Sequence, residues 1–222
     1  MKISIIIPAY NEEKTLASVI KEARKYTNKI IVIDDASHDS TYKIAKREGA
    51  KVYKHEVNKG LGGALKTGLN KAIEENTDIA ITLDADLQHD PNEIPSLIKP
   101  ILENEADVVI GSRFIINQKM PVKRKIYNKI GNIITYILFG VKCKDSQSGF
   151  RVFNKKALKL INIKTNGMEV SSEIIKEVRR NNLKLKEIPI KAIYTKYSIS
   201  KGQNFFSGIK TFFHLLKLKF QK

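Results

Sequence analysis

Short apolar runs alternate with helical patterns along the first half of this chain. Runs rich in β-branched residues predict strands at residues 2–8, 29–33, 50–55, 79–83 and 107–110. The intervals between these runs have the periodicity and the capping residues of helices, and parallel strands need crossovers of that kind. The pattern therefore predicts one α/β domain with a mostly parallel central sheet flanked by helices.

Two carboxylates follow the fourth of these strands. Asp84 and Asp86 are two residues apart on an extended segment, so both side chains project to the same side at the carboxyl end of the strand. Open α/β sheets bind their ligands at that edge. Two like charges so close repel each other unless a cation lies beside them. A hard divalent cation meets that need, with Gln88 as a third oxygen ligand, so we expect a metal site.

Helix capping is the alternative use of this acidic pair. A helix is expected to begin at Pro91, and Asp is common just before a helix. Asp90 is already placed to cap that helix, which leaves Asp84 and Asp86 without a structural role. The metal site is therefore the favoured interpretation, and its open coordination positions suit the phosphates of a substrate.

Other strand ends add polar side chains to the same edge of the sheet. Tyr10 and Glu12 follow the first strand, and Asp35 follows the second. Carboxylates accept hydrogen bonds from a base and a ribose, whereas a metal and nearby cations neutralise a diphosphate. Lys59 and Arg113, each at a junction after a strand, are the cations placed to help. Together these residues predict a cleft for a nucleoside diphosphate.

Two amphipathic helical patterns occur in the second half of the chain. The first, residues 121–139, has an apolar stripe and a basic start that includes Lys123 and Arg124. Cations oppose the helix dipole there, so we expect the cluster to attract an anionic ligand. The second, residues 205–220, either packs on the sheet or lies in a membrane interface, and its flanking lysines favour the membrane. We therefore expect a domain of residues 1–200 followed by an amphipathic, membrane-peripheral helix in residues 201–222. Further elements are expected at residues 150–153, 168–180 and 185–194.

Length, charge and cysteine content narrow the class of protein. A chain of 222 residues suits one domain, and the single Cys143 excludes an internal disulfide and indicates an intracellular protein. No run approaches the roughly 18 apolar residues of a membrane span. The net charge of +17 suits nucleic acid, an anionic membrane or a phosphorylated substrate. Carboxylates at strand ends repel a nucleic-acid backbone and Trp is absent, so a basic nucleic-acid-binding protein is the remote alternative.

Six short motifs together resemble one family of enzymes. They are Pro8-Ala-Tyr10-Asn11-Glu12, Asp34-Asp35-Ala-Ser, Asn58-Lys59-Gly60, Asp84-Ala-Asp86-Leu-Gln88-His, Gly111-Ser112-Arg113 and Asp145-Ser-Gln-Ser148-Gly149-Phe150-Arg151. In this order and at this spacing, they resemble the inverting family-2 glycosyltransferases of the GT-A fold. Within that family they are similar to the polyprenyl-phosphate sugar transferases, of which dolichyl-phosphate mannose synthase is the type. The resemblance implies a Rossmann-like GT-A sheet.

The resemblance also implies a role for each matching residue on the donor side. Asp86 and Gln88 would bind the Mg2+ or Mn2+ that bridges the diphosphate, and Asp86 and Arg113 would take part in catalysis. The residues implied to bind the nucleotide sugar, with Lys59 added from its position, are Pro8, Tyr10, Glu12, Ile33, Asp35, Lys59, Asp84, Ala85, Asp86, Gln88 and Arg113.

On the acceptor side, the resemblance implies Ser148, Arg151 and Lys201, and the basic start of the helix after Pro121 adds Lys123 and Arg124 from their position. A lipid phosphate is already an anion and needs no general base, whereas a hydroxyl acceptor needs Asp145 or Glu173 to take its proton. Thr195 and Ser198 stand where the lipid-phosphate enzymes usually carry an arginine and a glycine.

The resemblance therefore implies transfer of a sugar from GDP-mannose or a UDP-sugar to a polyprenyl (dolichyl) phosphate. It implies a metal-dependent hexosyltransferase bound peripherally to the cytoplasmic face of an anionic membrane, with no nucleic-acid partner. The alternative is a family-2 glycosyltransferase whose acceptor is a hydroxyl of a glycan or glycolipid.

Overall fold

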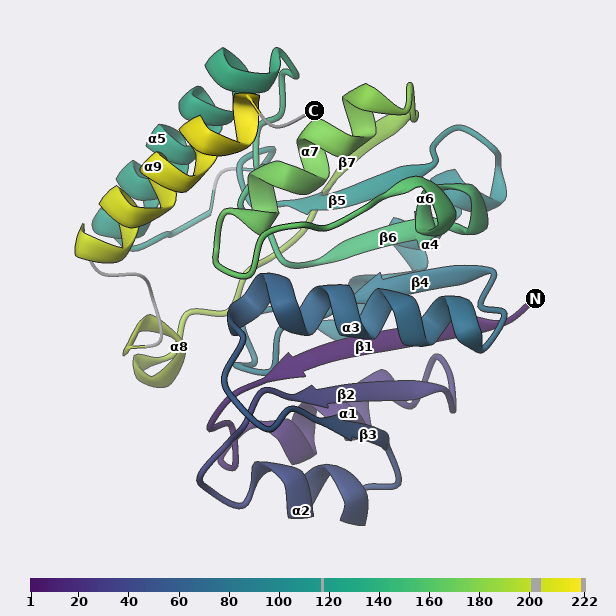
Figure 1. Ribbon diagram of the computed structural model, residues 1–222. Helices are drawn as coiled ribbons and strands as arrows, with labels where there is room; N and C mark the ends of the chain where they lie inside the picture. The colour runs from purple at the N-terminus through teal and green to yellow at the C-terminus, as the bar shows by residue number, and fades with distance from the viewer. Residues whose placement is uncertain (117, 201–204, 221–222) are drawn as a thin grey trace.

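A seven-stranded sheet forms the middle layer of the computed structural model, which describes residues 1–116, 118–200 and 205–220 (Figure 1). Its strand order is β3-β2-β1-β4-β6-β5-β7. The strands are β1 (Ile3–Ala9), β2 (Ile30–Asp34), β3 (Lys51–Lys54), β4 (Ile79–Thr82), β5 (Val108–Ser112), β6 (Arg151–Asn154) and β7 (Leu185–Pro189). The helices are α1 (Leu16–Ala23), α2 (Thr41–Arg47), α3 (Gly60–Glu74), η1 (Pro91–Glu93), α4 (Ile94–Leu102), α5 (Val122–Phe139), α6 (Lys155–Leu160), α7 (Val170–Arg180), α8 (Lys196–Ser200) and α9 (Phe205–Phe220).

The sheet is parallel except at β6, which confirms the predicted α/β class with a mostly parallel sheet. Strand β6 lies between β4 and β5 and pairs antiparallel with both, with Thr82 opposite Arg151. Its position was not predicted from sequence, because a four-residue strand shows no sign of its partners or direction. The insertion places the turn that precedes Arg151 beside the end of β4.

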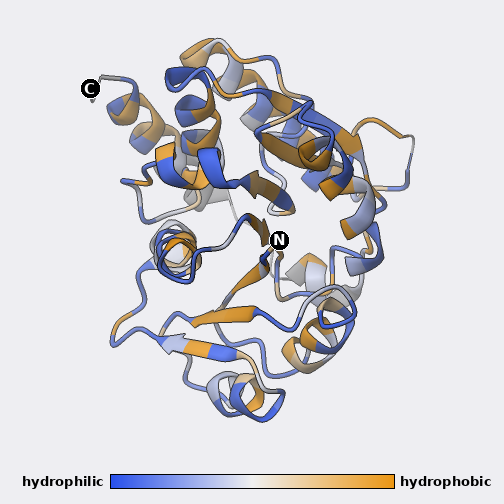
Figure 2. Ribbon diagram, turned by 90° about the vertical axis from the view of Figure 1, so that its right-hand side faces the viewer, coloured by the Kyte–Doolittle hydropathy of each residue, from blue (hydrophilic) through white to orange (hydrophobic). Residues whose placement is uncertain are grey.

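Alternate residues of the central strands face two separate apolar cores. Ile5 and Ile7 of β1 pack in the core under α1 and α4. Ile6, between them, packs in the core under α3, α6 and α7. This alternation is the period of an extended strand buried on both faces, each covered by helices. Figure 2 shows hydrophobic residues along the strands of the interior and many hydrophilic residues along the helices around them.

Three elements differ from the sequence prediction. The strand expected at residues 185–194 ends at Pro189, which has no backbone N–H to donate to a ladder. The chain then crosses to the segment after β4, where Ala192 bridges His89 and Ile193 donates a 2.9 Å hydrogen bond to the Gln88 carbonyl. Helices α6 and α8 were not expected, because five or six residues carry too little periodicity to predict a helix.

The carboxyl-terminal helix α9 packs on other helices. Its buried Leu215 and Leu218 lie against Phe139 of α5, and Lys176 of α7 donates a 2.8 Å hydrogen bond to the Leu218 carbonyl. Figure 1 shows α5 and α9 side by side at one end of the molecule. Phe213 remains 62% exposed, so one face of α9 is packed and another is open. Among the described residues, no helix combines the length and apolarity that crossing a membrane requires.

Candidate active site

The candidate site lies where the strand order reverses between β1 and β4. Strands β2 and β3 lie on one side of β1, and β4 lies on the other, so the crevice at their carboxyl ends is the expected place for a ligand. Three residues other than glycine with positive φ lie just past these strand ends: Asn11 at 54°, Ala36 at 62° and Leu87 at 63°. Backbone conformations of this kind gather at functional sites, where the surrounding structure holds them.

Asp84 and Asp86 are brought together as the sequence predicted. Burial raises the pKa of Asp84, against the opposing charges of Arg113 and Arg151. The pKa of Asp86 is raised first by burial and then by the charge of Asp84. The backbone N–H of Gln88 opposes this rise by donating a 3.0 Å hydrogen bond to the Asp86 carboxylate. Two neighbouring carboxylates whose pKa values are both raised by burial are a suitable ligand set for a divalent cation, whose charge would favour their ionised forms.

The rest of such a coordination sphere has to come from elsewhere. Within the ranges that the structure describes, no three His, Cys, Asp or Glu side chains converge on one point. A site with two carboxylates suits Mg2+ or Mn2+, which commonly take further ligands from substrate phosphates. The residues present therefore fit a metal that arrives with a diphosphate.

Gln88 joins the predicted metal site to the predicted acceptor helix. Arg124 of α5 donates a 2.9 Å hydrogen bond from Nη1 to Gln88 Oε1, and its Nη2 bonds the Ser198 carbonyl. The Arg124 guanidinium also lies 5.9 Å from the ring centroid of Tyr194. The predicted metal-binding oxygen of Gln88 thus accepts from a cation in this structure.

Glu12 and Tyr10 border the other side of the crevice. Tyr10 is exposed at the edge, with its ring 6.4 Å from that of His38. Glu12 is buried, and its carboxylate accepts from Tyr197 Oη at 2.8 Å and from Thr15 Oγ1 at 2.9 Å. The segment before and through α8 therefore lies over the end of β1. Pro8 and Ile33, also predicted to bind the nucleoside, are register partners on β1 and β2, and Ala85 is buried after β4.

Asp35 is placed at the start of α3. Its carboxylate accepts backbone N–H groups of Lys59 at 2.8 Å and Gly60 at 2.7 Å, and it lies 2.6 Å from His55 Nδ1. A carboxylate at a helix N-terminus satisfies amide groups that have no partner within the helix and opposes the dipole favourably. Asp35 therefore holds α3 in place, while the exposed Lys59 side chain projects beside the crevice.

Arg113 and Asp145 form a buried ion pair with two parallel hydrogen bonds. Arg113 donates from Nε to Asp145 Oδ2 at 2.7 Å and from Nη2 to Oδ1 at 2.8 Å. Burial alone would lower the pKa of Arg113, but the charge of Asp145 and these bonds raise it above the usual value. Glu187 of β7 in turn accepts the backbone N–H of Asp145 at 2.9 Å. Glu187 was missed from sequence, where it is one charge in an alternating strand.

Two predicted residues on the acceptor side are buried and bonded to the chain itself. Glu173 accepts the backbone N–H of Lys164 at 2.8 Å and both the N–H and the hydroxyl of Thr165. Arg151 donates to the carbonyls of Ser146, Ser148 and Ser171. Burial lowers the pKa of Arg151 to about 10. These groups hold the loops that border the crevice. Lys123 is exposed on α5, and Lys201 lies outside the described residues.

His89 is a further residue of the site that sequence reasoning did not single out. It is buried against Phe150, with ring centroids 5.2 Å apart, and its Nδ1 lies 3.5 Å from Asp84 Oδ2. Burial lowers its pKa to about 4. Its position directly after Gln88 could have indicated His89. The alternation along the extended segment, however, selects residues 84, 86 and 88 and leaves residue 89 on the other side.

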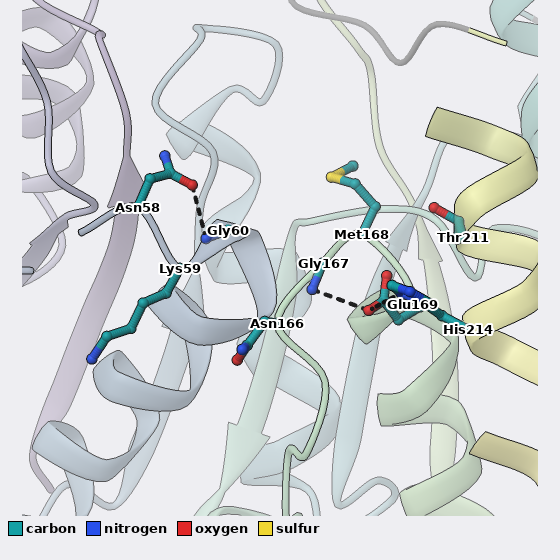
Figure 3. A pocket seen from close by; sticks show the side chains of 9 residues that line it. All are labelled: Asn58, Lys59, Gly60, Asn166, Gly167, Met168, Glu169, Thr211 and His214. Carbon is teal, nitrogen blue, oxygen red and sulfur yellow. Dashed lines mark hydrogen bonds and ion pairs between the residues drawn. The ribbon is translucent and has the colours of Figure 1, made fainter. Parts of the chain in front are cut away.

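A cavity of about 480 Å3 opens between the start of α3 and α9. Figure 3 shows Asn58 and Lys59 on one side and Thr211 and His214 on the other. Between them, Glu169 lies 3.1 Å from His214 Nδ1 and accepts the backbone N–H of Gly167 at 3.2 Å. Helix α9 is thereby bonded to the loop beside the predicted nucleotide-binding Lys59. Sequence reasoning did not predict this cavity, because it joins segments more than 100 residues apart.

A second cavity, of about 240 Å3, lies beside Arg113. Its apolar walls are Phe114, Ile115, Ile116 and Met120, and Lys125 of α5 lines it as well. Arg113 and Lys125 therefore border an apolar space, a combination that suits an amphiphilic anion.

Comparisons with known proteins show the family of the chain. The family model described as glycosyl transferase family 2 matches residues 4–161. The chain is 42% identical over 244 residues to a UDP-N-acetylglucosamine–dolichyl-phosphate N-acetylglucosaminyltransferase of Methanococcus voltae, a match covering 99% of this chain and 97% of that protein. It is 32% identical over 232 residues to a dolichol-phosphate mannosyltransferase of Pyrococcus furiosus, covering 98% of this chain and 62% of that protein.

A solved structure shows the same fold. The glucosyl-3-phosphoglycerate synthase of Mycobacterium tuberculosis, crystallised with Mn2+, UDP and glucosyl-3-phosphoglycerate, superposes with a TM-score of 0.77 at 20% identity. The match covers 98% of this chain and 79% of that one. With a matching family model over most of its length and the sheet of this fold, the chain belongs to glycosyl transferase family 2, and it is a glycosyltransferase.

Proposed function

We propose that this glycosyltransferase transfers a sugar, with inversion, from a nucleoside-diphosphate sugar to a polyprenyl (dolichyl) phosphate. The observation that carries the choice of acceptor is the state of the two candidate bases. Asp145 and Glu173 are each at most 1% exposed, and each accepts three hydrogen bonds from other groups of the chain. A hydroxyl acceptor needs a base that can reach its proton, whereas a phosphate monoester attacks as an anion. The arrangement favours the phosphate.

The chain's own groups supply most of the remaining chemistry. Asp84 and Asp86 would hold Mg2+ or Mn2+, with Gln88 as a further ligand once its oxygen is released by Arg124. When bound, that cation supplies positive charge to the leaving diphosphate. Arg113, fixed by Asp145, adds positive charge beside the leaving diphosphate and needs no reorganisation during the reaction. Tyr10, Glu12 and Lys59 border the space proposed for the nucleoside and its phosphates.

The identity of the donor is proposed from the relatives. Full-length similarity at 42% identity to an enzyme whose name specifies UDP-N-acetylglucosamine makes that nucleotide sugar the first to test. GDP-mannose is the second, because a mannosyltransferase is also among the relatives. Both relatives' names specify dolichyl or dolichol phosphate, which agrees with the acceptor argued from the buried carboxylates.

An exposed apolar face supports peripheral binding to a membrane. The outer face of α5 carries exposed apolar side chains, and Phe212 and Phe213 of α9 are exposed as well. In the first half of α5, exposed lysines accompany this face: Lys123, Lys125 and Lys129. The exposed apolar side chains of α5 are Val122, Ile126, Tyr127, Ile130, Ile133, Tyr136 and Ile137. Apolar side chains flanked by lysines suit the interface of an anionic bilayer, which we propose to be the cytoplasmic face.

A transfer assay tests the function. Purified protein is incubated with Mn2+ or Mg2+, labelled UDP-N-acetylglucosamine or GDP-mannose, and anionic vesicles with or without polyprenyl phosphate. Label in the lipid fraction that depends on the lipid phosphate is the expected result. Transfer that occurs only to a hydroxyl of a glycan or glycolipid, with none to the lipid phosphate, contradicts the proposed acceptor.

Vesicle sedimentation tests the membrane face. Replacing both Ile133 and Ile137 by Asp is expected to release the protein from anionic vesicles, because both residues are exposed on the proposed face. Ile73→Asp, at a partly exposed position on α3, is the control and should bind as the unmodified protein does. Equal binding by all three proteins excludes α5 as the contact surface.

A further inference from the structure

Two buried hydrogen-bond donors beside the candidate site have no acceptor. The Tyr194 hydroxyl and the Gln88 Nε2 group make no hydrogen bond within the described part of the chain. Leaving a buried polar group unpaired is costly, and most such groups in native proteins are paired. The two residues are neighbours, because Ile193 donates to the Gln88 carbonyl at 2.9 Å. Two unpaired donors side by side indicate a position kept for a ligand's acceptor atoms.

Positive charge surrounds the same position. The Arg124 guanidinium lies 5.9 Å from the centre of the Tyr194 ring. The positive charges of Arg113 and Arg124 both act on Tyr194, and a tyrosine hydroxyl carries its proton at neutral pH and can donate. Of the Arg113 donors, Nε and Nη2 bond Asp145, while Nη1 makes no hydrogen bond to the described residues. Two guanidinium groups and two neutral donors make a site for an anion with several oxygens.

The neighbouring residue explains why a tyrosine could serve here. Thr195 stands where the similar lipid-phosphate enzymes usually carry an arginine, and it exchanges hydrogen bonds with Ser198 at the start of α8. Its Oγ1 accepts the Ser198 N–H at 3.0 Å, and its own N–H donates to Ser198 Oγ at 3.0 Å. Position 195 therefore contributes no cation to the crevice. Tyr194, one residue earlier, is held beside Gln88 instead, because Ile193 bonds the Gln88 carbonyl.

We propose that Tyr194 is a phosphate-binding residue of this enzyme, whose hydroxyl donates together with Gln88 Nε2 to a phosphate oxygen held between Arg113 and Arg124. The phosphate belongs either to the polyprenyl phosphate or to the nucleoside diphosphate. Only the assignment of this phosphate to the polyprenyl phosphate rests on the proposed function. Because the hydroxyl is buried, the ligand reaches it when the bond between Arg124 and the Ser198 carbonyl opens, which turns that guanidinium toward the anion.

The experiment compares Tyr194→Phe with Tyr42→Phe by titration calorimetry. The first variant removes only the hydroxyl and keeps the ring that faces Arg124. The second removes a hydroxyl from a ring that also lies near cations, Lys46 and Lys54, but on the far helix α2. The probes are UDP and GDP with Mn2+, and a short prenyl phosphate in detergent micelles with the uncharged prenol as control. Chemical denaturation measures stability in parallel.

We expect Tyr194→Phe to bind a phosphate probe about ten- to a hundredfold more weakly, as for a lost hydrogen bond to a charged group, with Tyr42→Phe unchanged. Weakening confined to the prenyl phosphate assigns the acceptor, and weakening confined to UDP or GDP assigns the donor. The free energy of unfolding should stay the same or rise, because an unpaired buried hydroxyl is removed.

Two results separate the inference from the proposed function. If the unmodified protein binds both classes of probe and Tyr194→Phe binds them equally well, the inference is wrong. If the unmodified protein binds nucleotides but not the prenyl phosphate, the proposed acceptor is wrong, and the nucleotide titrations still decide the role of Tyr194. The inference is also overturned if Tyr194→Phe lowers the free energy of unfolding by as much as it weakens the free energy of binding. That result would show that the hydroxyl stabilises the fold.

Discussion

Arg113 bonds Asp145 through its side chain and its backbone at once. Besides the two side-chain bonds, the Arg113 N–H donates to Asp145 Oδ2 at 2.9 Å, so one carboxylate fixes both the end of β5 and the guanidinium. The bidentate geometry is specific to arginine. The pair turns two sequence motifs, 32 residues apart, into one positioned cation at the crevice.

Removing the charge of Asp145 should harm both folding and activity. Asp145→Asn keeps the shape but leaves Arg113 buried without its counter-ion, which costs on the order of 3–5 kcal/mol of unfolding free energy. Urea denaturation measures the loss. Glu105→Gln is the control, since Glu105 pairs with Lys186 and both side chains are exposed, and it should cost much less. Equal losses of unfolding free energy in the two variants would show that the buried pair stabilises the fold no more than a surface pair does.

Gly149→Ala should disturb the acidic pair without unfolding the protein. A Cβ built on Gly149 would lie 2.4 and 2.5 Å from the two carboxylate oxygens of Asp84, so that flexible side chain has to move. A displacement of about 1 Å at a reacting site can lower the rate about a hundredfold. We expect a fall of that order in sugar transfer with little change in melting temperature. An unaltered transfer rate would place Asp84 outside the working site.

Asp86→Asn should abolish metal-dependent nucleotide binding and leave the fold intact. The folded-state pKa of Asp86 is raised, so its ionised form costs stability once the pH rises above that pKa, and the amide should stabilise the metal-free protein at neutral pH. Asp78→Asn, before β4, is the matched control. There the backbone N–H of Lys2 lowers the pKa, so the same change should destabilise. Calorimetry with UDP and Mn2+, and thermal denaturation, measure both effects. Turnover by Asp86→Asn equal to that of the unmodified protein would refute the metal assignment.

The His89 imidazole should stay uncharged down to about pH 4 in the metal-free protein. Burial is the main cause, and a lowered folded-state pKa means that the stability it contributes is present above 6.5 and is lost as the pH falls from 6.5 toward 4. Asp84 and Asp86 act in the opposite sense, so a titration of the ring by NMR is the cleaner measurement. His89→Gln identifies the resonance. A midpoint near 6.5 would show that the ring is open to water.

Local patterns were enough to predict the fold class and one edge of the site. The apolar run before Asp84 and the acidic residues after β1 and β2 are each a property of a few neighbouring residues. Parallel strands bring their carboxyl ends to one edge, so these local signals could be assembled into a crevice without knowledge of any contact. Asp90 caps the helix that begins at Pro91, as expected, through a 2.9 Å bond from the Asn92 N–H.

The amino-acid sequence by itself determined the α/β class, the acidic edge and the six motifs, because periodicity and strand ends are local. Only the tertiary structure decided that Asp35 caps α3, that Glu173 holds a loop, and that Tyr194 lies beside Gln88. None of these contacts follows from local periodicity, because each depends on burial and on which hydrogen-bond partners remain once the chain is packed. A carboxylate looks the same in a sequence whether it binds a substrate or a backbone amide, and packing alone separates the two.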